Sequence, residues 1–302
     1  NLNSYWSEPS LVSSKFNSQT STNLKLSTDF FYILKSRLIN IRLGIKSPIW
    51  PRKSYSVTYF ENSNLEEKAI REKFVKKNDN TLNFLYCFDS NYHNQAFTSI
   101  HSLLENVSKK INIFVIHNRE FSVTELPDSI ANHNNLANFK SYKFVDKEHT
   151  FPNLENAHLS EATYYRLFIQ NYLPSDIEML IYLDGDTVCI NNPIPTIESQ
   201  LKQLDESNKI IAARTEYTIQ EYPDSETFKR LNMDSSYFNA GVLLINYRKW
   251  KENNLTNKLL KHMKKIQNDI VTWDQDVMNS LFNGDYVELK NTLNFNANSY
   301  DI

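Results

Sequence analysis

The chain has 302 residues, of which 40% are hydrophobic and 23% charged, and its formal net charge is −2. Residues 1–80 contain thirteen basic and seven acidic side chains, whereas residues 81–302 contain twenty basic and twenty-eight acidic ones. An acidic main part of this size is typical of a globular domain and argues against a nucleic-acid-binding protein. The four glycines form no Gly-rich phosphate-binding loop, and no apolar run approaches the length of a transmembrane helix.

The first 80 residues are predicted to be an extension of unknown role. Its start is polar and lacks the pattern of a signal peptide, and helices are predicted at 28–43 and 65–75. The polar run 76–80 indicates a linker, so we place a domain boundary there. The scattered basic residues leave peripheral contact with an anionic membrane open, but we favour a solvated surface as their explanation. Both ends of the chain suggest a fragment of a longer protein.

From residue 81 onward, predicted strands alternate with predicted helices, which is the pattern of an α/β domain with a mostly parallel sheet. Strands are predicted at 82–88, 111–116, 139–145, 179–183, 209–214, 238–245 and 286–289, and helices at 94–107, 124–133, 160–172, 247–266 and 274–282. The cysteines Cys87 and Cys189 have no metal-ligand spacing, so we interpret both as small buried side chains in a reducing compartment.

Two aspartates separated by one glycine, Asp184 and Asp186, directly follow the predicted strand 179–183. Because ligands bind outside the carboxyl ends of strands in open α/β sheets, these hard oxygen ligands are placed to hold Mg²⁺ or Mn²⁺ against a substrate diphosphate. The spacing alone is weak evidence, since it recurs at Asp274-Gln275-Asp276, and a solvated loop or a helix N-cap also explains it. Neither pair fits an EF-hand loop.

Five short blocks make the first aspartate pair more specific. In chain order they are Cys87-Phe-Asp89-Ser-Asn91-Tyr92, Leu159-Ser-Glu-Ala-Thr-Tyr-Tyr-Arg166, Ile181-Tyr-Leu-Asp184-Gly185-Asp186, Tyr237-Phe-Asn239-Ala240-Gly241 and Trp273-Asp274-Gln275-Asp276. Together they resemble glycosyltransferase family 8, and bacterial lipopolysaccharide α-galactosyl- and glucosyltransferases in particular. The resemblance covers residues 81–302, the segment that we expect to form the catalytic domain.

The resemblance implies a GT-A type α/β fold, with a mostly parallel central sheet flanked by helices and a helical or irregular N-terminal extension. It implies a metal-dependent, retaining hexosyltransferase that uses Mn²⁺ or Mg²⁺ and takes UDP-galactose or UDP-glucose as donor. The implied acceptor is a saccharide of lipopolysaccharide or another cell-surface glycan. The implied location is the cytoplasm, including peripheral contact with the inner face of the membrane.

The resemblance also assigns roles to residues of this chain. It implies that Asp184 and Asp186 bind the metal and that Gln275, Asp274 and Arg166 act at the reacting sugar and diphosphate. The implied donor-binding residues are Cys87, Asp89, Asn91, Tyr92, Arg166, Asp184, Gly185, Asn239, Ala240 and Gly241. His158 and Glu216 are implied near the acceptor. Each of these residues also has an ordinary structural explanation, such as an ion pair between Arg166 and Glu161. Asp276 is expected to hold an Arg or Lys side chain in place and not to contact the ligand.

Two other functions remain open at this stage. A relative of glycogenin or a protein-glycosylating transferase would carry the same blocks, although no tyrosine stands out as a self-acceptor. A catalytically silent nucleotide-sugar-binding domain is the alternative outside the enzymes. The family's usual C-terminal metal-binding His and its Gly-x-x-Lys-Pro-Trp segment do not occur up to Ile302. This absence matters only if the natural protein also lacks these residues. The metal would then have only two protein ligands, both carboxylates, and metal binding or turnover should be impaired.

Overall fold

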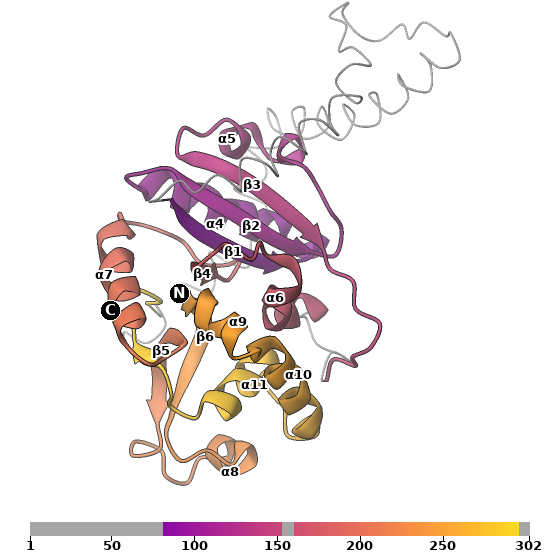
Figure 1. Cartoon of the computed structure of the whole chain (residues 1–302), viewed down its shortest axis with the longest axis vertical. Helices are drawn as coiled ribbons and strands as arrows, with labels where there is room; N and C mark the ends of the chain where they lie inside the picture. The colour runs from indigo at the N-terminus through magenta and orange to yellow at the C-terminus, as the bar shows by residue number, and fades with distance from the viewer. Residues whose placement is uncertain (1–80, 153–159, 296–302) are drawn as a thin grey trace, which may run out of the picture. The chain divides into compact units, whose positions relative to one another are not determined.

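The computed structural model describes residues 81–152 and 160–295, so the helices expected at 28–43 and 65–75 and the N-terminal extension lie outside it. The described part is built on a seven-stranded sheet in the order β3-β2-β1-β4-β6-β5-β7 (Figure 1). The strands are β1 (Leu82–Phe88), β2 (Ile111–His117), β3 (Leu136–Lys143), β4 (Met179–Leu183), β5 (Ile211–Thr218), β6 (Ser236–Asn246) and β7 (Val287–Glu288).

The sheet is mostly parallel, as the sequence predicts. Strand β1 pairs in parallel with β2 and β4, β2 with β3, and β5 with β7. Among the described strands, only β6 runs the other way, between β4 and β5. This arrangement confirms the predicted α/β fold class and places the ends of β1 and β4 side by side at one edge.

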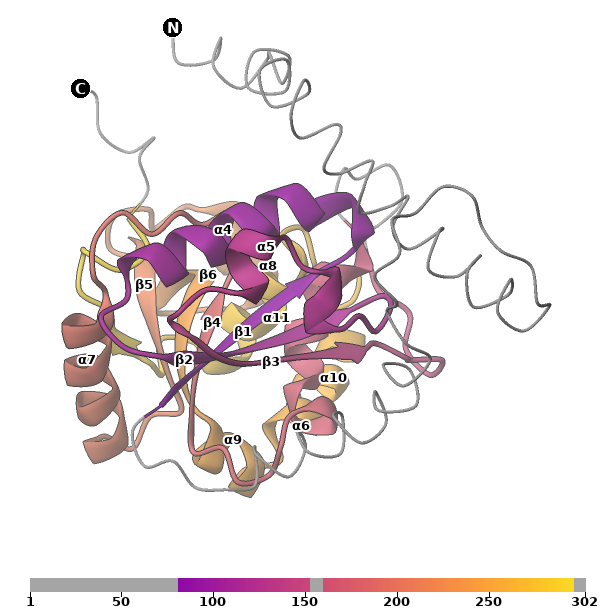
Figure 2. The same cartoon turned by 90° about the horizontal axis from the view of Figure 1, so that it is seen from above.

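Helices cover both faces of the sheet. Figure 2 shows α4 on one side of β1, β2 and β3, with α6 and α9 on the other. The α-helices are α4 (His93–Asn106), α5 (Asp128–Ala131), α6 (Ile169–Tyr172), α7 (Ile194–Glu206), α8 (Glu226–Leu231), α9 (Tyr247–Glu252), α10 (Leu255–Lys265) and α11 (Trp273–Phe282). The 3₁₀ segments are η1 (Ser90–Tyr92), η2 (Val123–Glu125) and η3 (Glu161–Phe168).

Strand β1 is buried on both faces, which explains its continuous apolar sequence. Phe84, Tyr86 and Phe88 belong to the core that also contains buried side chains of α4 and α7. Since successive side chains of a strand point to opposite faces, Cys87 lies on the other face, where it lines a cavity. Phe88, the last residue of β1, also lines this cavity, so the carboxyl end of the strand borders both the core and the cavity.

Three predicted helices differ from the structure. The segment predicted at 124–133 forms only η2 and α5, because Leu126 precedes Pro127 and takes the extended backbone that proline imposes on its neighbour. The segment predicted at 160–172 is 3₁₀ in η3 before it becomes α-helical in α6. The segment predicted at 247–266 is two helices, because Asn254 has a φ of 49° and interrupts them.

Helices α7 and α8 have no counterpart among the predicted elements. The signal for α7 was present, because Ile194, Ile197, Leu201 and Leu204 are buried at helical spacing. The prediction that both cysteines are buried holds for Cys87 and is wrong for Cys189, which is partly exposed. None of the helices within the described ranges is long and apolar enough to cross a membrane.

Candidate active site

The candidate site lies between β1 and β4, where the direction in which successive strands are added to the sheet reverses. From β1 the chain continues to β2 and β3 on one side, whereas β4 adds to the other side of β1. A crevice opens at such a point outside the carboxyl ends of the two strands, and α/β proteins bind nucleotides there. Asp89 directly follows β1 and Asp184 directly follows β4. The topology thus brings together two blocks that are about a hundred residues apart.

A cavity of about 270 Å³ occupies this place. It is lined by residues from the ends of β1 and β4, from η3 and β6, and from the start of α11. The lining residues are Cys87, Phe88, Asp89, Tyr92, Ser160, Ala162, Thr163, Arg166, Asp184, Gly185, Asp186, Ala240, Thr272, Trp273, Asp274 and Gln275. All five sequence blocks therefore contribute to one cavity.

Arg166 joins three of these blocks. Its Nη2 donates to Asp184 Oδ1 at 2.6 Å and its Nη1 donates to the carbonyl oxygen of Ala240 at 2.6 Å. Its Nε lies 2.9 Å from Asp274 Oδ2, although these two atoms are not aligned as a hydrogen bond. The side chain is 8% exposed, and its guanidinium carbon lies 4.1 Å from the ring centre of Tyr182. Arg166 is thus a fixed cation in the cavity, and the alternative explanation, an ion pair with Glu161, does not apply because Glu161 accepts from Tyr165 instead.

Asp274 is a buried carboxyl with a shifted pKa. Burial raises its pKa to about 6, Arg166 and Thr163 act in the opposite direction, and the negative charge of Asp184 adds to the rise. Burial disfavours the charged form of a carboxyl, and a nearby cation restores only part of the loss. Arg166 therefore stands between two carboxylates and is shared by them.

The aspartate pair after β4 offers oxygen ligands suitable for a divalent cation. Asp184 Oδ1 accepts from Arg166 and from the hydroxyl of Tyr182 at 2.6 Å. Among the described residues Asp184 Oδ2 accepts no hydrogen bond, and Asp186 is exposed beside it. Partial desolvation of its carboxyl and the negative charge of Asp184 raise the pKa of Asp186, and the positive charge of Arg166 offsets only part of this rise.

These residues fit a Mg²⁺ or Mn²⁺ ion. Such ions are commonly held by one or two carboxylates, with water and substrate phosphates completing the shell. Within the described ranges no group of three or more His, Cys, Asp or Glu side chains is arranged to hold a metal alone. Asp184 and Asp186 therefore suit an ion that binds together with a diphosphate.

The turn after β1 contributes two residues to the cavity lining. The side chain of Asp89 caps η1 by accepting from the backbone N–H of Asn91 at 2.9 Å, and Asp89 is 7% exposed. Burial and, to a smaller extent, the negative charges of Asp186, Asp184 and Asp89 raise the pKa of Tyr92. Asp89 and Tyr92 line the cavity, whereas Asn91 does not.

Strand β6 approaches the aspartate pair through a glycine. A Cβ atom at Gly241 would lie 3.0 Å from Asn239 Oδ1 and 3.1 Å from Asp184 Oδ2, which is too close for most side-chain contacts. Asn239 Oδ1 accepts from the backbone N–H of Gly241 at 2.9 Å. Of this block only Ala240 lines the cavity directly. Asn239 and Gly241 thus shape the surroundings of Asp184.

Gln275 lines the cavity, and both ends of its side-chain amide are hydrogen-bonded. Its Oε1 accepts from the backbone N–H of Ala240 at 2.9 Å. Its Nε2 donates to Glu216 Oε2 at 3.3 Å and to the hydroxyl of Tyr237 at 3.4 Å. Glu216 therefore contacts the site through Gln275 without lining the cavity. His158 lies outside the described residues.

Some site residues were missed by sequence reasoning. Tyr182 contacts both Arg166 and Asp184, and it lies on β4 two residues before Asp184, which directly follows the strand, so both side chains point to the same side. Trp273 lines the cavity with a φ of 45°, which is unusual for a bulky residue. No sequence signal indicates this backbone conformation. Ser160, Ala162 and Thr163 lie within a recognised block but had no assigned role.

Comparison with known proteins agrees with this geometry. The profile described as "Glycosyl transferase family 8" matches residues 83–301. The chain belongs to glycosyltransferase family 8. A putative glycosyltransferase of Haemophilus influenzae is 32% identical over 229 residues, which is 74% of this chain and 66% of that protein. A lipopolysaccharide 1,2-glucosyltransferase of Escherichia coli is 29% identical over 210 residues, which is 67% of this chain and 59% of the relative.

The family assignment extends to the fold. The crystal structure of galactosyltransferase LgtC with donor and acceptor sugar analogues matches this family 8 chain with a TM-score of 0.58 and 22% sequence identity. The match covers 70% of this chain and 74% of LgtC. The fold is therefore of the GT-A type, as predicted. The chain spans about two thirds or less of the two curated relatives named above.

Proposed function

We propose that this family 8 chain is the donor-binding and catalytic part of a metal-dependent, retaining glycosyltransferase. It transfers glucose or galactose from a UDP-sugar to a saccharide acceptor in the synthesis of lipopolysaccharide or another cell-surface glycan. The observation that carries the proposal is the shared cavity at the ends of β1 and β4, with Asp184, Asp186 and the buried cation Arg166 together. The relatives named above supply the choice of sugars and acceptor.

The residues that line the cavity suit the three parts of a nucleotide sugar. Asp89 and Tyr92 offer a hydrogen-bonding carboxylate and an aromatic ring to the base. Arg166 stands between Asp184 and Asp274, so its charge would face a diphosphate bound at the aspartate pair. Asp274 and Gln275 line the same cavity and would face the hexose.

Departure of UDP leaves negative charge on the diphosphate, and this chain offers two ways to stabilise it. Arg166 is a permanently charged donor that is already desolvated and oriented by its carboxylate partners, so it needs little reorganisation during the reaction. Asp184 and Asp186 would hold Mg²⁺ or Mn²⁺, which supplies Lewis-acid stabilisation of the leaving diphosphate when bound. The buried carboxyl of Asp274 is placed to favour positive charge on the sugar ring.

Gln275 is more consistent with an orienting role than with a nucleophilic one. A double displacement requires a nucleophile such as a carboxylate, whereas Gln275 is an amide whose Oε1 already accepts from the Ala240 N–H. We therefore favour attack by the acceptor on the face from which UDP departs, with a leaving phosphate oxygen as base. In this route Gln275 positions the sugar and the acceptor without forming a covalent bond.

The proposal is tested by incubating the protein with UDP-glucose or UDP-galactose and Mn²⁺, with and without oligosaccharide acceptors. Release of UDP with formation of an α-linked product supports it, and a silent nucleotide-sugar-binding domain would release none. The Gln275→Ala variant should lower kcat by about 100-fold, since loss of one transition-state contact has an effect of this size. Its affinity for UDP should stay within about 3-fold of wild type, because such a contact is made only in the transition state. Equal loss of UDP binding and turnover would contradict the role of Gln275.

A further inference from the structure

We infer that Asp276 is a positioning residue of the transfer reaction, which holds the segment 271–275 in place as one wall of the cavity. This inference rests on the proposed function for the reaction that it serves. It concerns a residue that does not line the cavity and therefore acts through its neighbours. The evidence is the set of hydrogen bonds that converge on its carboxylate.

The carboxylate of Asp276 is fully buried, with 0% exposure, and accepts hydrogen bonds from five donors. Its Oδ2 accepts from the backbone N–H groups of Val271 at 2.7 Å and Thr272 at 2.9 Å, and from Nη1 of Arg230 at 2.7 Å. Its Oδ1 accepts from the hydroxyls of Thr272 at 2.6 Å and Tyr237 at 2.7 Å. These donors come from the segment before α11, from α8 and from β6.

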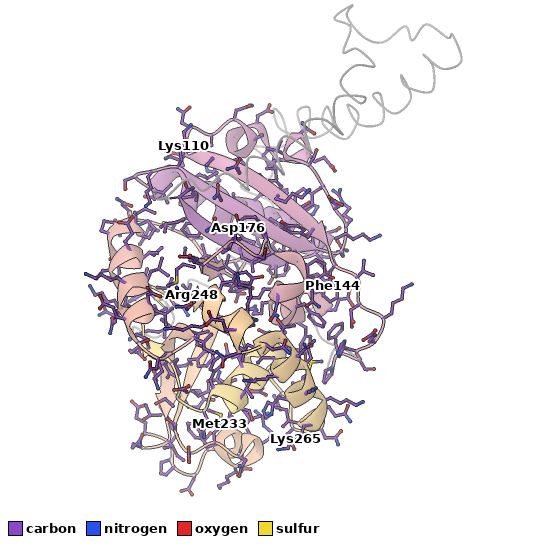
Figure 3. All side chains as sticks on the ribbon, in the orientation of Figure 1. Lys110, Phe144, Asp176, Met233, Arg248 and Lys265 are labelled. Atoms are coloured by element: carbon purple, nitrogen blue, oxygen red, sulfur yellow. The ribbon has the colours of Figure 1, made fainter. Side chains whose placement is uncertain are left out.

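The donors are themselves fixed by the fold. Tyr237 belongs to a small core with Phe228, Leu231 and Met233, the residue labelled in Figure 3 that follows α8. Arg230 lies on α8, within the same part of the chain. A buried carboxylate is tolerated only when its charge and lone pairs are satisfied, and here they are. The hydrogen bonds from Arg230, Thr272 and Val271 accordingly lower the pKa of Asp276 despite its burial.

One consequence concerns the backbone of Trp273. Its φ of 45° lies in the left-handed region, which is unfavourable for a bulky side chain and persists only where the surroundings enforce it. Both neighbours of Trp273 are tethered, since Thr272 donates to Asp276 and Asp274 pairs with Arg166. The tether to Asp276 therefore keeps Trp273 in the cavity wall.

A second consequence concerns the amide of Gln275. Its Nε2 donates to the hydroxyl of Tyr237 at 3.4 Å, and this hydroxyl donates in turn to Asp276 Oδ1. The hydrogen bonds thus run in one direction from Gln275 through Tyr237 to the buried carboxylate. Asp276 thereby fixes the orientation of the Tyr237 hydroxyl, and the hydroxyl helps to fix the amide of Gln275.

The test compares two buried tyrosine hydroxyls, of which only that of Tyr237 is connected to this network. Tyr237→Phe removes the link between Asp276 and Gln275. Tyr247→Phe is the matched control, because the hydroxyl of Tyr247 is buried too but donates to the backbone carbonyls of Ile169 and Leu173. Tyr237→Phe should lower kcat by about 10-fold with the donor KM within about 3-fold, whereas Tyr247→Phe should leave kcat within about 2-fold. If the wild type is active and the two variants have equal kcat values, the inference is overturned.

A second measurement decides the inference without any turnover. The protein contains four tryptophans, and 5-fluorotryptophan labelling with Trp273→Phe assigns the ¹⁹F resonance of Trp273. Asp276→Asn, which preserves the shape of the side chain, should shift or broaden this resonance, and Tyr247→Phe should leave it unchanged. An unaltered Trp273 resonance in Asp276→Asn would contradict the inference. Absence of UDP-hexose turnover by wild type would count against the proposed function alone, since this readout does not depend on it.

Discussion

The two aspartate pairs of this chain have the same spacing and opposite environments. Asp184 and Asp186 follow the end of β4, where one carboxylate oxygen is not used by the fold and the second carboxylate is exposed. Asp274 and Asp276 lie in the first turn of α11, and both are buried. Asp274 faces Arg166 in the cavity, whereas Asp276 faces Arg230 and the backbone behind the cavity.

This difference shows that the spacing of two aspartates does not define their chemistry. A strand end at the crevice leaves carboxylate oxygens available to a ligand, whereas in the first turn of a helix neighbouring residues point in different directions. The first pair is therefore suited to bind an ion together with substrate. The second pair contributes one carboxyl to the cavity and one to its support.

The largest effect on stability is expected from removing Arg166, the cation that Asp184 of the first pair shares with Asp274 of the second. Arg166→Leu leaves Asp184 and Asp274 facing each other without a counter-ion, and breaking a buried ion pair in this way costs about 3–5 kcal/mol of stability. Urea unfolding at pH 7.5 measures the change. The matched control is Arg248→Leu, which breaks the exposed pair with Asp205 and should cost no more than about 1 kcal/mol. Equal losses for the two variants would contradict the shared-cation description.

A pH series separates the two carboxyls of the second pair. The folded state raises the pKa of Asp274 to about 6, so it binds more protons than the unfolded state between about pH 4 and 6. The penalty of ionising Asp274 is absent below its unfolded pKa and complete above its folded one. Wild type should therefore lose up to about 3 kcal/mol of stability relative to Asp274→Asn between pH 4 and 7, at about 1.36 kcal/mol per pKa unit.

Asp276 should show the opposite sign. Its folded pKa is lowered, so the stability that its charge contributes is present above the unfolded pKa and is lost as pH falls through the folded pKa. Asp276→Asn should therefore destabilise the protein more at pH 6 than at pH 3, as measured by thermal or urea unfolding. The same pH trend for Asp274→Asn and Asp276→Asn would show that the two side chains do not differ as the structure indicates.

The smallest expected effect tests how closely β6 approaches the first pair. Gly241→Ala places a Cβ atom 3.1 Å from Asp184 Oδ2, so it should displace this carboxylate and weaken metal-dependent UDP binding by about 10-fold. Gly284→Ala is the control, because Gly284 lies outside the cavity lining, has a φ of 82°, and its Cβ would meet the side chain of Ser235. Its effect should fall on stability, at about 1 kcal/mol, and leave binding within about 3-fold. The reverse ranking in UDP titrations would contradict the geometry.

The sequence predicted the strands that carry the site better than the helices that surround it. The buried runs that form β1 and β4 are unambiguous, and the rule that ligands bind beyond strand ends placed Asp184 at the edge where the cavity lies. Asp89, which only the family resemblance indicated, follows β1 at the same edge. The opposite environments of Asp274 and Asp276 could not be predicted, because they depend on Arg166 and Arg230 arriving from distant segments. The conformation of Trp273 is likewise set by tertiary contacts, whereas the apolar spacing that forms α7 was present in the sequence and was overlooked.

The most direct test of the central claim is calorimetric titration of UDP into the protein with and without Mn²⁺. The wild type should bind UDP much more tightly with Mn²⁺, and the double variant Asp184→Asn/Asp186→Asn should lose this dependence while remaining folded. The double variant Asp205→Asn/Asp234→Asn, which alters two carboxylates outside the cavity lining, should retain it. Metal-dependent UDP binding that survives in Asp184→Asn/Asp186→Asn would contradict the assignment of this aspartate pair to the donor site.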